Sequence, residues 1–222
     1  MLVLDSQFDN VPKVLIQPAG YAFSIWGPIF LGMIIYSWFQ MKPERVDSPH
    51  LHTATLAGIS AALASIAFVP INYLNIQWFV FVNIIWHLIS LIFLFVALRK
   101  QIVLETNTNT HWYYLPTQMY LGWISAATAI STALMLTEAG LILPIEQQVT
   151  ITAVIIGALI LIGTFMAFQK GMVVPLVFIW AAIGIIVENG NYSTIKYAST
   201  AAIVILAIIS LSQIIKQKRL AF

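Results

Sequence analysis

The feature that most constrains this chain is a series of long stretches without a charged side chain. In one of them, residues 77–98, there is no Asp, Glu, Lys or Arg. About 20 apolar residues in a helix span the hydrocarbon core of a bilayer. Only 8% of the 222 residues are charged, whereas a soluble domain carries about 25%. Because so few charges could not cover a water-exposed surface, we expect an integral membrane protein.

The apolar stretches divide the chain into seven predicted spans. We expect an all-α, seven-transmembrane helical bundle, with residues 1–222 forming a single integral membrane domain. Polar residues, Pro or Gly punctuate the stretches. The predicted spans cover residues 22–41, 52–70, 77–98, 113–137, 149–169, 172–188 and 198–215.

The basic residues predict which way the bundle is oriented. If the ends of the seven spans alternate between two sides, eight of the 10 Lys and Arg residues fall on one side, and Lys13 and Lys196 on the other. Cytoplasmic loops carry the excess of Lys and Arg. We therefore expect the N-terminus outside and the C-terminus in the cytoplasm, and we assign the protein to the bacterial inner (plasma) membrane. The eight residues are Lys42, Arg45, Arg99, Lys100, Lys170, Lys216, Lys218 and Arg219.

Composition and motifs also narrow the classes of function. A net charge of +2 gives no reason to expect a nucleic-acid partner, and the absence of Cys excludes thiolate chemistry. No ionisable Asp, Glu, Lys or Arg lies in the middle of a span, which argues against proton relay. His50 and His52 are interpreted as solvated loop residues, so no metal site is expected. The sequence nominates no catalytic residues and no nucleophile or acid–base pair, so an enzyme is not the preferred interpretation.

The third span carries the most polar helix face. Asn83, His87 and Ser90 are spaced so that they share one face, with Trp86 beside them. Amide and imidazole groups are costly to expose to lipid, so we expect this face to point into the bundle. Two interpretations stay open: the groups bond neighbouring helices as structural contacts, or they line a ligand cavity.

The fourth span carries a weaker polar stripe of Gln118, Ser125, Thr128 and Thr132. Hydroxyls in a membrane helix can bond their own backbone carbonyls, so the stripe gains meaning only if it faces the polar side of the third span.

Tryptophans in unusual positions suggest an aromatic pocket. Trp86, Trp123 and Trp180 lie near mid-span and Trp26 lies one to two turns into the first span. A buried Trp N–H needs a partner, so four such residues could wall a flat pocket or could fill helix crossings. In the entry sequence PAGYAFSIWGPIF, residues 18–30, we expect Gly27 and Pro28 to make a kink or a close helix contact that turns Phe23 and Trp26 toward the bundle.

Small residues recur four apart, as in helix seams that pack closely in lipid. They are found on the second, fourth and fifth spans, for example Ala57 and Ala61, Gly122 and Ala126, and Ala153 and Gly157. Packing within one bundle and a homodimer interface are the two interpretations.

Three segments, in order along the chain, resemble signatures of the TspO/MBR family, the tryptophan-rich sensory or translocator proteins. The first is PAGYAFSIWGPIFLGMIIY, with Pro18, Phe23, Trp26 and Phe30. The second is LNIQWFVF and the third is LPTQMYLGWISAAT, which contains Pro116, Tyr120, Trp123 and Thr128. Because typical members have five spans, the chain resembles an extended, divergent member with a TspO-like core and additional helices.

The resemblance implies a function as well as a fold. It implies an aromatic-lined intramembrane cavity for a tetrapyrrole such as haem or protoporphyrin, or for a sterol- or lipid-like molecule, used in sensing or transport. The expected ligand-binding residues are Pro18, Phe23, Trp26, Asn83, Trp86, His87, Trp123, Thr128 and Trp180. The alternatives are a transporter of a neutral or amphipathic solute and a structural or assembly subunit of a larger membrane complex.

Overall fold

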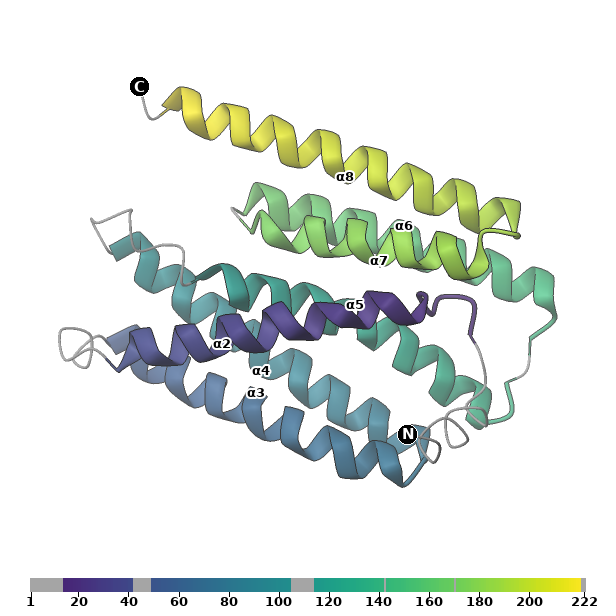
Figure 1. Cartoon of the computed structure of the whole chain (residues 1–222), viewed down its shortest axis with the longest axis horizontal. Helices are drawn as coiled ribbons and strands as arrows, with labels where there is room; N and C mark the ends of the chain where they lie inside the picture. The colour runs from purple at the N-terminus through teal and green to yellow at the C-terminus, as the bar shows by residue number, and fades with distance from the viewer. Residues whose placement is uncertain (1–13, 42–48, 105–113, 142, 170, 221–222) are drawn as a thin grey trace.

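The protein is a bundle of antiparallel helices (Figure 1). The computed structural model describes residues 14–41, 49–104, 114–141, 143–169 and 171–220, and these ranges contain helices and no strands. A 3₁₀ helix, η1, opens the bundle, and seven α-helices follow it. Their bounds are η1 Gly20–Ile25, α2 Trp26–Gln40, α3 Pro49–Tyr73, α4 Gln77–Leu104, α5 Leu115–Glu138, α6 Ile145–Phe168, α7 Val173–Asn189 and α8 Ser193–Leu220.

Six of the helical segments are long and apolar enough to cross a membrane. They are the continuous segment Gly20–Gln40, α3, α4, α5, α6 and α8. The seventh predicted span corresponds to α7, a shorter apolar helix of 17 residues. The protein is therefore a multi-pass integral membrane protein with six candidate spans and one shorter apolar helix, α7.

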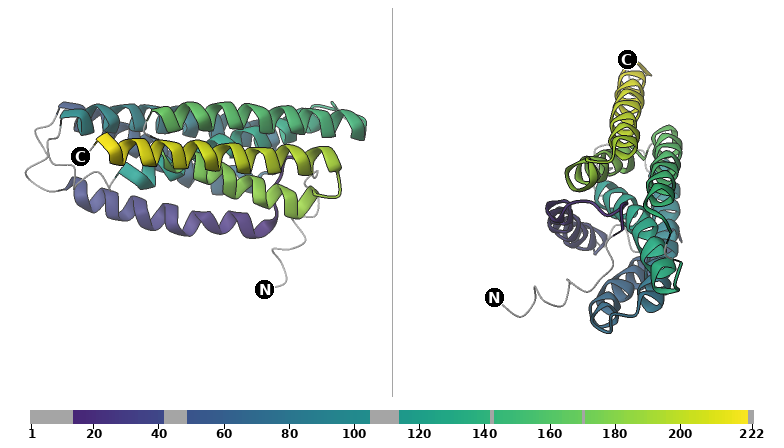
Figure 2. Two further views of the ribbon diagram at one scale, coloured as in Figure 1. Left: turned by 90° about the horizontal axis from the view of Figure 1, so that it is seen from above. Right: turned by 90° about the vertical axis from the view of Figure 1, so that its right-hand side faces the viewer.

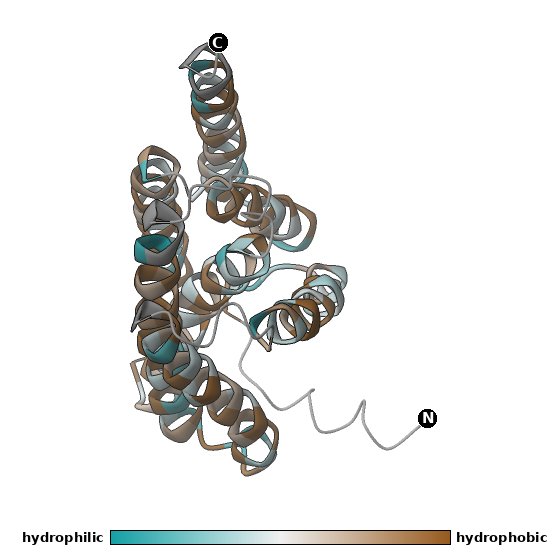
Figure 3. Ribbon diagram, turned by 90° about the vertical axis from the view of Figure 1, so that its left-hand side faces the viewer, coloured by the Kyte–Doolittle hydropathy of each residue, from teal (hydrophilic) through white to brown (hydrophobic). Residues whose placement is uncertain are grey.

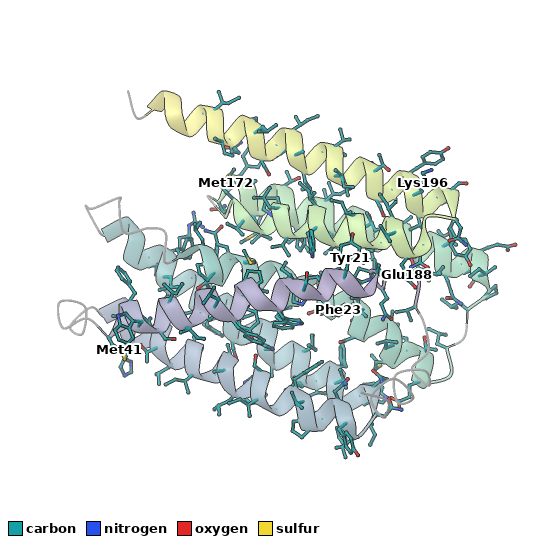
Figure 4. The ribbon with its side chains drawn as sticks, viewed as in Figure 1. Tyr21, Phe23, Met41, Met172, Glu188 and Lys196 are labelled. Atoms are coloured by element: carbon teal, nitrogen blue, oxygen red, sulfur yellow. The ribbon has the colours of Figure 1, made fainter. Side chains whose placement is uncertain are left out.

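The helix ends fall into two groups, as an alternating topology requires. The C-terminal ends of α2, α4, α6 and α8 lie toward one end of the bundle, and the C-terminal ends of α3, α5 and α7 lie toward the other (Figure 1). Side chains follow the same division, with Met41 and Met172 near the first end and Glu188 and Lys196 toward the second (Figure 4). Which end faces the cytoplasm stays a prediction from charge. Of the basic residues behind it, Lys13, Lys42, Arg45 and Lys170 lie outside the described residues, as do the side chains of Lys218 and Arg219.

Seen along the helix axes, α5 lies in the middle of the bundle (Figure 2). It packs on α4, which pairs with α3, and on α7, which contacts α6 and α8. By contrast, α2 stands on one face and packs mainly against α5 and η1. Hydrophobic residues lie on all sides of the helices (Figure 3). Large apolar side chains such as those of Trp38 and Ile34 are mostly exposed, which fits a surface that meets lipid.

The entry to the first span differs from the predicted kink. The 3₁₀ turn of η1 passes directly into α2, and Pro28 lies in the first turn of α2, where a missing N–H leaves no helical bond broken. Gly27 has open space where a Cβ would lie, so it makes no close contact. The close approach is one turn further on, because a Cβ on Gly32 would lie 2.7 Å from Pro116 of α5.

Most of the small residues serve packing inside the chain. On α3, Ala54, Ala57, Ala61 and Ala64 are buried, and α3 has its main contact with α4. On α5, a Cβ at Gly122 would meet Val177 of α7 at 3.1 Å. Gly157 on α6 has no atom within 4 Å of its Cβ position, so this seam has no close partner within the described residues.

Candidate aromatic site

Aromatic rings from η1, α2 and α5 meet at one place in the bundle. Trp123 of α5 receives the edges of Phe23 and Trp26, with ring centroids 5.5 Å and 6.4 Å apart and planes nearly perpendicular. Trp26 also stacks on Phe30 at 5.1 Å and meets the ring of Tyr120 edge-on at 5.7 Å. We call Phe23, Trp26, Phe30, Tyr120 and Trp123 the aromatic cluster. Edge-to-face pairs at these distances stabilise beyond simple burial.

The cluster is buried on one side and open on the other. Trp123 is almost fully buried, whereas Phe23 and Phe30 are 38% and 47% exposed. The exposed rings lie on η1 and α2, and α2 packs mainly against α5 and η1, which leaves its other side uncovered. The cluster therefore has a face toward the membrane.

An N-terminal strap closes the cluster at one end of the bundle. The strap, residues 14–22, is held by α7: the Ala19 N–H donates to the Gly184 carbonyl at 3.0 Å, and the Asn189 side chain donates to the Leu15 and Gln17 carbonyls at 3.0 and 3.2 Å. The indole N–H of Trp180 donates to the Ala22 carbonyl at 2.9 Å.

At the same end of the bundle, Tyr21 and Phe23 of η1 pack against two different helices. Tyr21 lies edge-on to Trp180 of α7, and Phe23 lies against Trp123 of α5; the two side chains diverge from η1 (Figure 4).

A narrow apolar cavity lies beneath the strap, with a volume of about 10 Å³. This volume is near the minimum that one water molecule needs. The lining residues are Ile16, Pro18, Trp123, Ala126, Ile130, Leu159, Ala181 and Ile185. A ligand the size of a tetrapyrrole could therefore enter this cavity only if the helices or the strap moved.

One polar side chain of α4, His87, contacts the cluster, and a second, Asn83, lies one turn before it. The imidazole of His87 meets the Tyr120 ring edge-on at 4.9 Å, and the Tyr120 hydroxyl is hydrogen-bonded to that of Ser65 on α3. One turn before, the Asn83 amide donates to the Ala64 carbonyl at 3.1 Å. Asn83 and His87 are each only 2% exposed, and Asn83 Oδ1 and His87 Nε2 have no hydrogen-bond partner among the described residues.

Trp86 is placed differently from the predicted inward face, whereas Ser90 is buried as predicted. Trp86 is 40% exposed, and its indole N–H donates at 3.0 Å to Ser60 of α3, which also bonds Ser90 at 2.8 Å. Trp86 therefore joins α3 to α4 near the surface and lies outside the aromatic cluster. Here the interpretation as a structural contact between helices fits the geometry.

The polar stripe of α5 does not face α4. Ser125, Thr128 and Thr132 each bond the carbonyl four residues earlier on their own helix. Gln118 accepts a bond from the Val173 backbone N–H at 3.0 Å and so satisfies a free donor at the start of α7. Since Gln118 and Tyr120 are two residues apart, they lie on nearly opposite sides of α5.

The structure thus brings together five of the nine expected ligand-binding residues, Phe23, Trp26, Asn83, His87 and Trp123. Pro18 and Trp180 belong to the adjoining strap contact, and Trp86 and Thr128 lie elsewhere. The expected set omits Tyr120, which links Trp26 of α2 to His87, and Phe30, which stacks on Trp26. Their spacing could have revealed them, because Tyr120 precedes Trp123 by three residues and Phe30 follows Trp26 by four, so each pair shares a helix face.

The fold and the cluster define a multi-pass helical membrane protein with aromatic rings gathered where an edge helix meets the bundle core. The family model described as TSPO-like protein matches residues 5–212. The chain therefore belongs to the TSPO-like protein family, as the three sequence segments indicate. No curated protein and no solved structure matches the chain significantly.

Proposed function

We propose that this protein binds a flat, largely apolar small molecule, tetrapyrrole or sterol/lipid-like, at the aromatic cluster within the membrane. The observation that carries the proposal is the meeting of Trp26, Tyr120 and Trp123 beside the buried polar groups of Asn83 and His87. Ligand sites generally combine apolar and aromatic walls with a few placed polar groups.

The ligand would enter from the lipid, between α2 and the rest of the bundle. Because α2 packs mainly on α5 and η1, it is the helix that can separate at the smallest loss of contact. Phe23 and Phe30 are already partly exposed on this side. Separation of α2 would place the faces of Trp26 and Trp123 against a flat guest.

We further propose that all seven helices cross the bilayer, with the N-terminus outside and the C-terminus in the cytoplasm of a bacterial inner membrane. The connectivity supports this. The C-terminal end of α6 and the start of α8 lie at opposite ends of the bundle, and α7 runs from one to the other (Figure 1). Its 17 residues give about 25 Å at 1.5 Å per residue, near the lower limit for a span.

Protoporphyrin IX tests the binding proposal, using its own absorption band in lipid nanodiscs as the signal. We expect saturable binding, and Trp26→Ala should weaken it by about two- to twelvefold, the effect of losing roughly one aromatic contact of 0.5–1.5 kcal/mol. The matched control is Trp38→Ala on the same helix, because Trp38 is 73% exposed and lies outside the cluster. Non-saturable uptake, or equal loss in both variants, would reject this site for the porphyrin.

Sensing and transport are separated by flux. Liposomes that contain the protein should bind the porphyrin without releasing it on the far side if the protein is a receptor. Faster passage than in protein-free liposomes would instead favour the transporter alternative.

The homodimer is also testable, since Gly157 offers an open small-residue surface on α6. A Gly157→Leu variant that stays dimeric in mild detergent would place the interface elsewhere.

A further inference from the structure

Two buried polar atoms on one face of α4 have no hydrogen-bond partner among the described residues. Asn83 Oδ1 and His87 Nε2 belong to residues one turn apart on the same face of α4. Both residues are 2% exposed. Leaving a buried polar atom without a hydrogen bond is costly, so a pair of such atoms on one face indicates a bound group that the chain itself does not supply.

The bonding of Asn83 fixes what its free atom can do. Its Nδ2 donates to the Ala64 carbonyl, and a carbonyl can only accept, so the amide cannot be turned round. Oδ1 is therefore an acceptor that needs a donor. His87 is the complementary group, because an imidazole Nε2 donates in one neutral tautomer and accepts in the other.

We propose that Asn83 and His87 form a subsite for the hydroxyl group of an apolar alcohol, in preference to a carboxylate. This rests on the proposed function, since it names the polar group of the ligand at the same site. A hydroxyl donates its hydrogen to Asn83 Oδ1 and accepts from His87 Nε2–H. A carboxylate has no hydrogen to donate and would place its negative charge against the amide oxygen.

The surroundings fit a ligand whose remaining parts are apolar. The ring of Tyr120 separates His87 from Trp26, and the hydroxyl of Tyr120 is already bonded to Ser65. Among the described residues, Asn83 Oδ1 and His87 Nε2 are therefore the unpaired polar atoms on the α4 side of the cluster. An alcohol would place its hydroxyl on this pair and its rings against Tyr120, Trp26 and Phe30.

Three pyrene probes with the same ring system test the proposal: 1-pyrenemethanol, 1-pyrenecarboxylic acid and 1-methylpyrene. Binding to the full chain in nanodiscs is measured by energy transfer from Trp to pyrene. The quantity compared is the ratio of the affinity for pyrenemethanol to the affinity for methylpyrene. We expect this ratio to be at least fivefold higher in wild type than in His87→Phe. Comparing the ratio between two proteins in the same bilayer cancels the different partitioning of the probes into lipid.

The variants separate the hydroxyl contact from folding. His87→Phe keeps a ring against Tyr120 and removes the nitrogens, so methylpyrene should bind it as wild type does. His87→Gln restores a polar group and should recover part of the preference. Asn83→Leu gives a second, independent loss, and Thr132→Val is the control because Thr132 bonds only its own helix backbone among the described residues.

The outcomes are distinct. Loss of the alcohol preference in His87→Phe and Asn83→Leu, with methylpyrene unaffected, supports the subsite. Equal ratios in wild type and variants would mean that the pair holds only water. A preference for the carboxylate that the variants abolish would mean that the subsite takes a carboxylate and not a hydroxyl. Either result overturns this inference and leaves the proposed ligand binding intact. No saturable binding of any pyrene or of protoporphyrin would overturn the proposed function with it.

Discussion

At the scale of single residues, contacts decide which polar and aromatic side chains form the site. Asn83, His87 and Trp86 are close together in sequence, yet Trp86 bonds Ser60 near the surface while His87 meets Tyr120 inside. Glycines show the same dependence on position. A Cβ at Gly184 would lie 2.7 Å from Pro18 and 3.1 Å from Ala22, whereas Gly157 has open space.

Gly184→Ala should therefore loosen the strap. The added methyl group overlaps Pro18, and overpacking of this kind costs about 1–3 kcal/mol. Thermal unfolding in mild detergent should show a lower midpoint for this variant, while Gly157→Ala, with its open space, leaves the midpoint near that of wild type. An unchanged midpoint for Gly184→Ala would mean that the strap does not lie against α7 as described.

At the scale of elements, a few hydrogen bonds from side chains to backbone groups join segments that are distant in sequence. The strap depends on Asn189, whose side chain donates to two carbonyls. The start of α7 depends on Gln118. Neither contact follows from the pattern of its own helix, because each donor and acceptor is satisfied by a residue distant in sequence.

Asn189→Asp removes the two donated bonds with almost no change of shape. We expect faster amide hydrogen exchange in residues 15–19, including the Ala19 N–H that bonds Gly184, because local opening becomes easier. Asn191→Asp is the control, since Asn191 is exposed at the neighbouring turn. Exchange that rises equally in both variants would point to a general effect of the added charge.

Gln118→Leu should weaken the contact between α5 and α7. The Val173 N–H then loses its acceptor in a partly buried place, at a cost of at most about 1–3 kcal/mol. We expect a lower unfolding midpoint than for Gln148→Leu, whose side chain bonds only the nearby Leu143 carbonyl among the described contacts. Equal midpoints would show that water replaces the Gln118 oxygen.

At the scale of the whole molecule, alternating helix directions bring basic residues of different helices to one end of the bundle. Arg99 and Lys100 near the end of α4 share one end of the bundle with Lys216 of α8, and Lys196 lies at the opposite end (Figures 1 and 4). The aromatic cluster lies between these ends, where the edge helix α2 meets the core.

Single cysteines test this arrangement in the membrane, since the chain has none of its own. In inner-membrane vesicles of known sidedness, a membrane-impermeant maleimide should label Lys100→Cys and Lys216→Cys from the cytoplasmic side and Lys196→Cys from the opposite side. Labelling of Lys100→Cys and Lys216→Cys from different sides would refute the alternating topology.

The sequence by itself determined the helical membrane class, the positions of seven helices and the family, because long uncharged apolar stretches and local motifs need no knowledge of distant contacts. It also determined that Asn83 and His87 point inward, since their polarity is costly in lipid. Only the tertiary structure decided that Tyr120 and Phe30 complete the cluster, that Thr128 and Trp86 lie outside it, and that Gly32 makes the close contact expected of Gly27. These depend on how each helix is rotated against its neighbours. Hydropathy constrains that rotation weakly, because the lipid-facing and the bundle-facing surfaces are both apolar.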